Sequence, residues 1–112
     1  MENDCLFCQI VAGKRPADIV FRDETVVIFN DINPHAPVHL LIVPTKHIRS
    51  VNDLAEGDEG IVGAMVLRGR DMAKKLGVDR SGYRLSVNVE RGAGQVIFHL
   101  HLHLTAGWRA AY

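Results

Sequence analysis

Three histidines alternate with leucines near the end of this 112-residue sequence, in the run FHLHLHL at residues 98–104. Successive side chains of a β-strand point to opposite faces, so His99, His101 and His103 are expected to share one face, about 6–7 Å apart from one to the next. The leucines are then expected to enter the core. Imidazole can be a nucleophile, a proton carrier or a metal ligand near neutral pH. A single histidine on such a strand would more often be structural, but three in register predict a functional site.

A glycine-rich segment, ERGAGQ at residues 90–95, directly precedes the histidines. Backbone N–H groups of such loops can bind phosphate oxygens. Attack on phosphorus requires an unprotonated ring nitrogen, and neighbouring imidazoles can donate hydrogen bonds to phosphoryl oxygens or protonate the leaving atom. The loop alone would be weak support, but its position beside the histidines favours chemistry at a phosphate.

Two cysteines, Cys5 and Cys8, have the C-x-x-C spacing that supplies half of a tetrahedral zinc site. Two histidines would complete a closed structural site with no open position for water. The alternative is a pair of reduced, partly buried cysteines, which a lone C-x-x-C pair often is.

Composition excludes some classes of partner. The chain has 13 basic and 13 acidic residues and a formal net charge of zero, whereas a nucleic-acid surface needs a basic excess. No apolar run approaches the roughly 20 residues of a membrane-spanning helix, and the acidic N-terminus is unlike a secretory signal. We therefore expect a cytoplasmic protein with no nucleic-acid or membrane partner. Its length fits one domain, residues 1–112.

The elements that must position these residues follow from local patterns. A short helix is predicted over residues 6–12, and a long helix is predicted to begin at a cap formed by Asn52 or Asp53 and to end at Gly77. Strands are predicted over residues 18–21, 25–29, 38–43, 83–89 and 96–104. Glycines 60, 63 and 69 of the long helix indicate close packing against the sheet or a second subunit. The fold class is α+β, with a five-stranded antiparallel sheet.

The run GQVIFHLHLH at residues 94–103 resembles the signature of the histidine triad nucleotide-binding proteins. The following LTAGW is similar to the Hint branch of that family, and FNDINPHAPVH (residues 29–39) and IVPTKHI (residues 42–48) extend the resemblance over nearly the whole chain. It implies a homodimer whose two subunits share one continuous sheet. It also implies hydrolysis of purine nucleoside phosphoramidates or related nucleotidyl compounds through a nucleotidyl-histidine intermediate.

The resemblance further implies roles for individual residues. His101 is the expected nucleophile, His103 is expected to contact the phosphate and the leaving group, and His39 belongs to the same polar cluster. The implied nucleotide-binding positions are Asp31 at the ribose, Asn88 and the backbone around Gly94 and Gln95 at the phosphate, and Phe7, Ile10, Phe29 and Ile32 around the base. Zinc-bearing members of the family imply His47 and His99 as the partners of Cys5 and Cys8 in a structural zinc site.

Val96 departs from the family pattern, because many Hint-like proteins carry there a serine or threonine that bonds the phosphate. Loss of one such donor is expected to lower the rate by roughly one to three powers of ten. Val96 therefore favours an alternative function, a nucleotide-binding regulatory module with little turnover. A third reading is a catalytic zinc ion held by the histidine row and His39, which would activate water.

Overall fold

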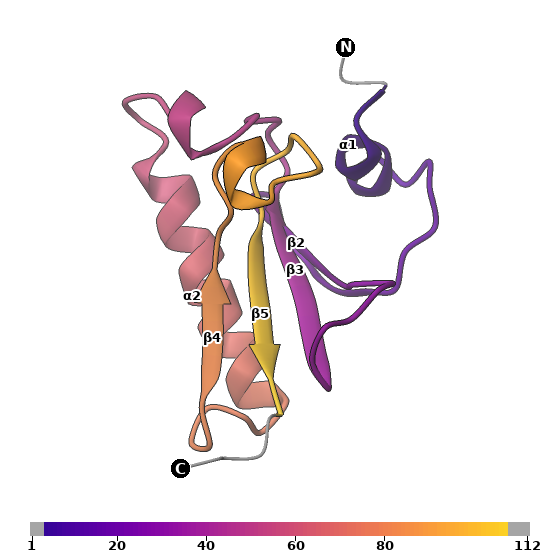
Figure 1. Ribbon diagram of the computed structural model, residues 1–112, viewed down its shortest axis with the longest axis vertical. Coiled ribbons are helices and arrows are strands. Elements are labelled where there is room, and N and C mark those ends of the chain that lie inside the picture. Colours follow the sequence, from indigo (N-terminus) through magenta and orange to yellow (C-terminus); the bar gives the residue numbers. More distant parts are fainter. Residues whose placement is uncertain (1–3, 108–112) are drawn as a thin grey trace.

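The computed structural model describes residues 4–107, in which five antiparallel strands form one sheet between two α-helices (Figure 1). The spatial order is β1-β2-β3-β5-β4. The strands are β1 (Ile19–Arg22), β2 (Val26–Asn30), β3 (Val38–Pro44), β4 (Tyr83–Ser86) and β5 (Leu102–Ala106). The short helix α1 (Leu6–Val11) and the long helix α2 (Glu59–Lys75) agree in number and type with the sequence prediction. No helix within residues 4–107 is long and apolar enough to cross a membrane.

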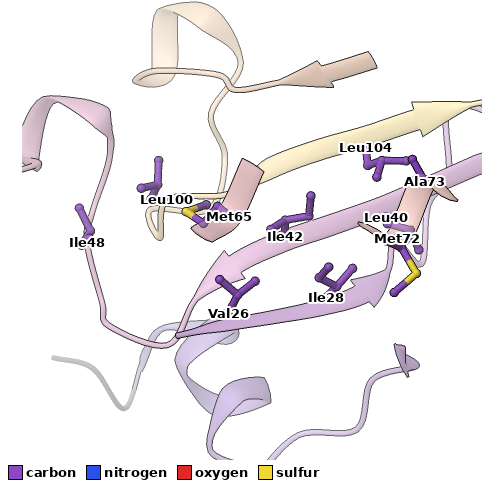
Figure 2. Close-up of a cluster of buried hydrophobic side chains, with 10 residues drawn as sticks. All are labelled: Val26, Ile28, Leu40, Ile42, Ile48, Met65, Met72, Ala73, Leu100 and Leu104. Carbon is purple, nitrogen blue, oxygen red and sulfur yellow. The ribbon is translucent and has the colours of Figure 1, made fainter. Parts of the chain in front are cut away.

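Alternation along the central strands separates two faces of the sheet. On β2, Val26 and Ile28 pack into the core beneath α2, whereas Val27 and Phe29 pack with α1. The α2 side carries the main core, which also contains Leu40, Ile42, Ile48, Met65, Met72, Ala73, Leu100 and Leu104 (Figure 2). The opposite side carries a smaller cluster of Phe7, Ile10, Val27, Phe29, Leu41 and Val43. Alternate residues of β2 and β3 thus face α2 and α1.

Close packing between α2 and the sheet is confirmed at one of the three helical glycines. A Cβ atom added at Gly69 would lie 2.8 Å from Cδ1 of Ile42 and 3.3 Å from Cδ2 of Leu85. Gly60 and Gly63 have nothing within 4 Å of such an atom among the described residues. Of these three helical glycines, only Gly69 is therefore required by packing against other described residues.

The predicted start of the long helix at Asn52 or Asp53 is wrong. Residues Val51–Asp53 form a single 3₁₀ turn capped by Ser50, whose hydroxyl oxygen accepts a hydrogen bond from the Asn52 N–H at 3.1 Å. Gly57, with a φ of +93°, then turns the chain before α2 begins at Glu59. The end is as predicted: Gly77 has a φ of +75°, its N–H donates to Lys74 and the next N–H donates to Ala73, which is the Schellman arrangement.

Two predicted strands differ from the observed ones by several residues, whereas the other three differ by no more than one residue at either end. β4 ends at Ser86 rather than at residue 89, and β5 begins at Leu102 rather than at residue 96. Residues 87–101 leave the sheet because Glu90 and Gly94 both take positive φ, 69° and 92°, around a 3₁₀ turn at Arg91–Ala93. The Leu100 N–H donates to the Ile48 carbonyl at 2.6 Å instead of to β4. Only His103 of the three histidines therefore lies in a regular strand.

Candidate active site and metal centre

The three histidines nevertheless lie on one side of the sheet, the side covered by α1. The rings of His99 and His101 pack in T-shaped contacts with Phe7 from α1 at centroid distances of 5.9 and 5.2 Å, and the rings of His101 and His103 are 5.0 Å apart. Leu100 and Leu104 point into the core beneath α2. The common face predicted from the alternation is confirmed, although the regular strand that was expected to produce it covers only the end of the row.

The hydrogen bond of His101 fixes where its proton lies. Its Nδ1 atom is 2.7 Å from the carbonyl oxygen of His99. A carbonyl oxygen can only accept, so Nδ1 carries the hydrogen and Nε2 keeps a lone pair. Burial lowers the pKa of His101, opposed by the hydrogen bond to His99 and by the charge of Asp31. A neutral imidazole with its Nε2 lone pair available is the form that can attack an electrophile.

A chain of contacts assigns the opposite role to His103. The backbone N–H of His35 donates to Nδ1 of His39 at 3.0 Å, so the hydrogen of neutral His39 lies on Nε2. That Nε2 is 2.9 Å from Nδ1 of His103 and 3.4 Å from Oδ2 of Asp31. His39 therefore donates to His103, whose own hydrogen is then on Nε2. The neighbours His101 and His103 thus offer an acceptor and a donor.

His103 is expected to stay neutral over a wide pH range. Burial, with the nearby His101, His39 and His35, lowers the pKa of His103 to about 4, and Asp31 opposes this by raising it. Replacement of Asp31 by asparagine should therefore lower this pKa further, and replacement of His39 by glutamine should raise it. Titration of the ¹⁵N imidazole signals measures both shifts, and an ordinary midpoint near 6.5 would contradict the assignment.

The same shift has a consequence for stability. Because the folded pKa of His103 lies below the unfolded value, the unfolded chain binds the proton more tightly. The contribution of neutral His103 to stability is complete above about pH 6.5 and is lost as the pH falls from there toward 4.

The positions implied for the nucleoside differ in exposure. Phe7, Ile10 and Phe29 are buried, and Phe7 and Phe29 pack edge to face at 5.4 Å. Ile32 is 88% exposed. Asp31 accepts a hydrogen bond from the Asn33 N–H through Oδ1 at 2.8 Å, while its Oδ2 faces His39. The structure brings the aromatic pair and Asp31 to the histidines, but it leaves Ile32 outside the apolar cluster.

Several polar groups of the glycine-rich loop bind one another in hydrogen bonds. The N–H groups of Gly94 and Gln95 donate to the carbonyls of Arg91 and Glu90, and the Asn88 side chain donates to the Ala93 carbonyl at 2.7 Å. Val96 is 83% exposed, and within residues 4–107 its N–H makes no hydrogen bond. The Val96 N–H, unlike those of Gly94 and Gln95, is thus not used in a hydrogen bond within the described part of the loop.

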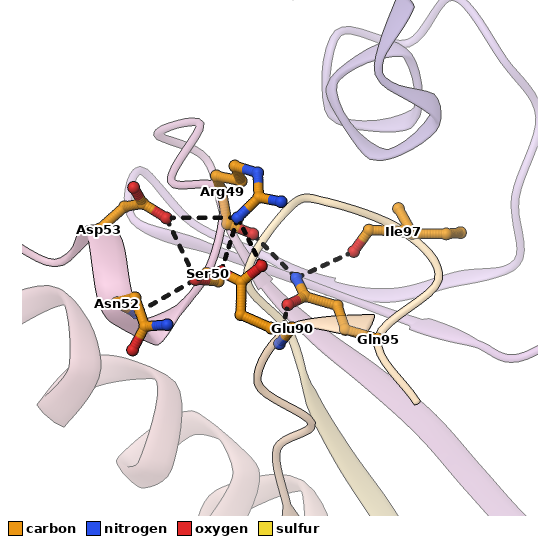
Figure 3. Close-up of polar contacts among 7 residues, drawn as sticks. All are labelled: Arg49, Ser50, Asn52, Asp53, Glu90, Gln95 and Ile97. Carbon is orange, nitrogen blue, oxygen red and sulfur yellow. Dashed lines mark hydrogen bonds and ion pairs between the residues drawn. The ribbon is translucent and has the colours of Figure 1, made fainter. Parts of the chain in front are cut away.

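A polar network that the sequence analysis missed connects this loop to the segment after β3 (Figure 3). One guanidinium nitrogen of Arg49 lies 2.7 and 2.6 Å from the two carboxylate oxygens of Glu90, and the Ser50 hydroxyl donates to the same carboxylate at 2.7 Å. These bonds lower the pKa of Glu90, the Arg49 bond most. Gln95, which is buried, donates to the Arg49 and Ile97 carbonyls and accepts from the Glu90 N–H. No local pattern signals it, because its members are about 40 residues apart.

Cys5, Cys8, His47 and His99 form a second cluster, with one ligand atom of each within 4.8 Å of all the others. Nδ1 of His47 is 3.1 Å from the Cys8 sulfur, and Nδ1 of His99 is 3.4 and 3.5 Å from the Cys5 and Cys8 sulfurs. Ligands of a tetrahedral zinc ion lie about 3.3–3.8 Å from one another, given Zn–N and Zn–S bonds of about 2.0 and 2.3 Å. The four residues implied by the resemblance therefore fit a metal.

The second ring nitrogen of His99 supports the same arrangement. Its Nε2 lies 2.9 Å from the Pro44 carbonyl, so this nitrogen carries the hydrogen and Nδ1 directs a lone pair at the two sulfurs. A histidine ligand usually donates its other N–H to a carbonyl or carboxylate in this way. Asp31, His39 and His103 also lie within 4.8 Å of one another, but their contacts are accounted for by the hydrogen bonds given above.

Comparisons with known proteins agree over nearly the whole chain. A family model described as the scavenger mRNA decapping enzyme C-terminal binding region matches residues 4–109. The purine nucleoside phosphoramidase of Escherichia coli K12 is 38% identical over 107 residues, which are 96% of this chain and 90% of that protein. The solved HIT family hydrolase from Legionella pneumophila Philadelphia 1 superposes with a TM-score of 0.93 at 43% identity, covering 95% of each chain. A histidine triad protein from Clostridium difficile gives 0.92 at 38%, covering 97% of this chain and 95% of that one.

Proposed function

This chain belongs to the histidine triad family, and we propose that it is a hydrolase that cleaves purine nucleoside phosphoramidates or related nucleotidyl compounds. The observation that carries the proposal is the acceptor–donor pair of His101 and His103, whose rings are 5.0 Å apart. The E. coli relative that is named a purine nucleoside phosphoramidase supports the substrate class.

The proposed reaction has two displacements at the same phosphorus. Nε2 of His101 attacks the α-phosphorus and the P–N bond to the leaving amine breaks, while the amine takes up a proton from solvent. The Nε2–H of neutral His103 donates a hydrogen bond at the phosphate and leaving group and keeps its hydrogen, since losing it would leave an imidazolate. A water molecule then attacks the nucleotidyl-His101 intermediate, the bond between phosphorus and Nε2 breaks, and a proton from the water passes to solvent. The products are a nucleoside monophosphate and the free amine.

The remaining site residues would bind and orient the nucleotide. The Val96 N–H is available to a phosphoryl oxygen, and Asn88 lies on the same loop. Asp31 is assigned to the ribose hydroxyls, and Phe7 with Phe29 to the base. Release of AMP from adenosine 5′-phosphoramidate tests the proposal, with AMP affinity measured in parallel. If the protein binds AMP but releases none, the regulatory-module alternative replaces the hydrolase.

Val96→Ser should raise turnover by roughly tenfold or more, because a hydroxyl beside the Val96 N–H adds a hydrogen-bond donor to the phosphate. The side chain is 83% exposed, so the exchange should leave stability nearly unchanged. Steady-state kinetics of Val96→Ser, with the isosteric Val96→Thr beside it and Val96→Ala as the control without a hydroxyl, measures the effect. Equal rates in all the variants and the wild type would show that this position does not limit the reaction.

We also propose that Cys5, Cys8, His47 and His99 hold a structural zinc ion. The distances within the cluster and the orientation of His99 support this. Such an ion would attach α1 to the sheet and supply no reaction chemistry, since four protein ligands leave no open position.

A homodimer is proposed as well. β4 lies at one edge of the sheet, at the end of the strand order β1-β2-β3-β5-β4. Beside it, Val87, Val66 and Leu67 are 37%, 42% and 43% exposed. Pairing of two β4 edges would continue the sheet across two subunits and cover these apolar side chains.

A further inference from the structure

We propose that Glu90 and Arg49 are positioning residues, which hold the loop of residues 88–97 at a fixed place beside His101 and thereby set the rate of phosphoryl chemistry. The inference rests on the proposed function, but it concerns residues to which neither the family signature nor the sequence analysis gives a role.

The backbone of Glu90 is the first step of the argument. Its φ of 69° and ψ of 169° lie in a region that is open to glycine and rarely occupied by other residues. Such a conformation persists only when the surroundings over-determine it. Here the Glu90 N–H donates to Gln95, its carbonyl accepts from Ala93 and Gln95, and both carboxylate oxygens are bonded by Arg49. The carboxylate is thus held from outside the loop.

The group that holds Glu90 is also attached to the histidine segment. The Ile48 carbonyl accepts from the Leu100 N–H at 2.6 Å, directly before His101, and the Arg49 carbonyl accepts from the Gln95 side chain at 2.8 Å. The Arg49 guanidinium lies 4.5 Å from the centre of the Phe98 ring. Residues 48–50 therefore contact both the loop and the segment that leads to His101, and so connect the two.

Because the Arg49–Glu90 ion pair is partly exposed, its removal is expected to affect the position of the loop more than the stability of the fold. The side chains of Arg49 and Glu90 are 47% and 34% exposed, and ion pairs at such sites contribute little to folding. Their removal should leave the protein folded and should release the loop. A displacement of about 1 Å at a reacting centre can cost about a hundredfold in rate.

The test compares AMP release by the full-length wild type with that of Glu90→Ala, Glu90→Gly, Arg49→Met and the double variant Arg49→Met/Glu90→Ala. We expect each single change to lower kcat by about 10–100-fold while KM changes less than about threefold. The double variant should lose no more than a single one, because the two side chains act as a pair. Arg80→Met, an exposed arginine in the turn between α2 and β4, is the matched control and should retain the wild-type kcat.

Glu90→Gly separates the carboxylate from the backbone conformation, because glycine adopts this φ and ψ without strain. Wild-type kcat in Glu90→Gly would overturn the proposal. Amide hydrogen exchange of residues 91–97 gives a second readout, expected to be at least about tenfold faster in the Glu90 and Arg49 variants than in Arg80→Met. If the wild type releases no AMP, the proposed function fails, and the exchange rates alone decide whether Glu90 holds the loop: unchanged rates overturn the inference, and faster rates support it.

Discussion

Replacement of His101 by alanine should reduce AMP release from adenosine 5′-phosphoramidate by at least about four powers of ten, as expected when the nucleophile of a covalent mechanism is removed. The reason is specific to this ring. Its Nδ1–H is bound to the His99 carbonyl, so Nε2 keeps the only lone pair that the ring can offer. Alanine removes that lone pair and leaves Phe7 and the core leucines in place. Single-turnover assays of folded variant and wild type measure the loss.

A chemical rescue distinguishes a missing nucleophile from a damaged site. His101→Gly leaves room for a free imidazole, which should restore part of the activity in proportion to its concentration. Both variants should still bind AMP with nearly the wild-type affinity, because neither removes Asp31 or the loop. Retention of more than a few per cent of the activity by His101→Ala would assign the attack to another group.

Removal of the proposed zinc ion should destabilise the fold by several kcal/mol, since a structural site releases its binding free energy on folding. We expect a strong chelator, or replacement of Cys8 by serine, to lower the melting temperature by more than about 10 °C. The purified protein should contain one zinc per chain by elemental analysis. Differential scanning calorimetry with and without added zinc measures the shift, and Lys14→Ser, at an exposed position just after α1, is a control in the same part of the chain.

The chelation experiment also tests the catalytic-zinc alternative. A nucleophilic mechanism should keep its turnover well below the lowered melting temperature, because the proposed metal touches neither ring nitrogen of His101. If turnover disappeared while the protein stayed folded, a metal at Asp31, His39 and His103 would account for it, since these atoms also lie within 4.8 Å of one another. A protein that holds no zinc and melts unchanged with chelator would leave Cys5 and Cys8 as ordinary reduced cysteines.

The parts of the fold that could be predicted are those that depend on residues close together in the sequence. β2 was recognised because four successive residues, Val26 to Phe29, are β-favouring and all become buried. The end of α2 was recognised because Gly77 combines a cap with the end of an apolar repeat. The common face of the three histidines followed from simple alternation.

The parts that it missed depend on contacts between distant residues. Asn52 and Asp53 are good capping residues, but they lie in a 3₁₀ turn capped by Ser50. Gly57 then turns the chain, so that α2 begins only at Glu59. The strand predicted over residues 96–104 is interrupted because Leu100 bonds Ile48 and because Gln95 is buried against Arg49. The role of Glu90 could not be predicted from its neighbours in sequence. Glutamate rarely adopts the observed φ and ψ, and the residues that bind its carboxylate, Arg49 and Ser50, lie about 40 positions earlier.

The alternation between residues 99 and 104 has an evolutionary consequence. The imidazoles face α1 while Leu100 and Leu104 fill the core beneath α2, so one periodic pattern specifies the reactive surface and the interior together. Deletion or insertion of a single codon here would exchange the two faces and bury imidazoles where leucines belong. We therefore expect lineages that descend from this gene to vary in this stretch by substitution and to conserve its length.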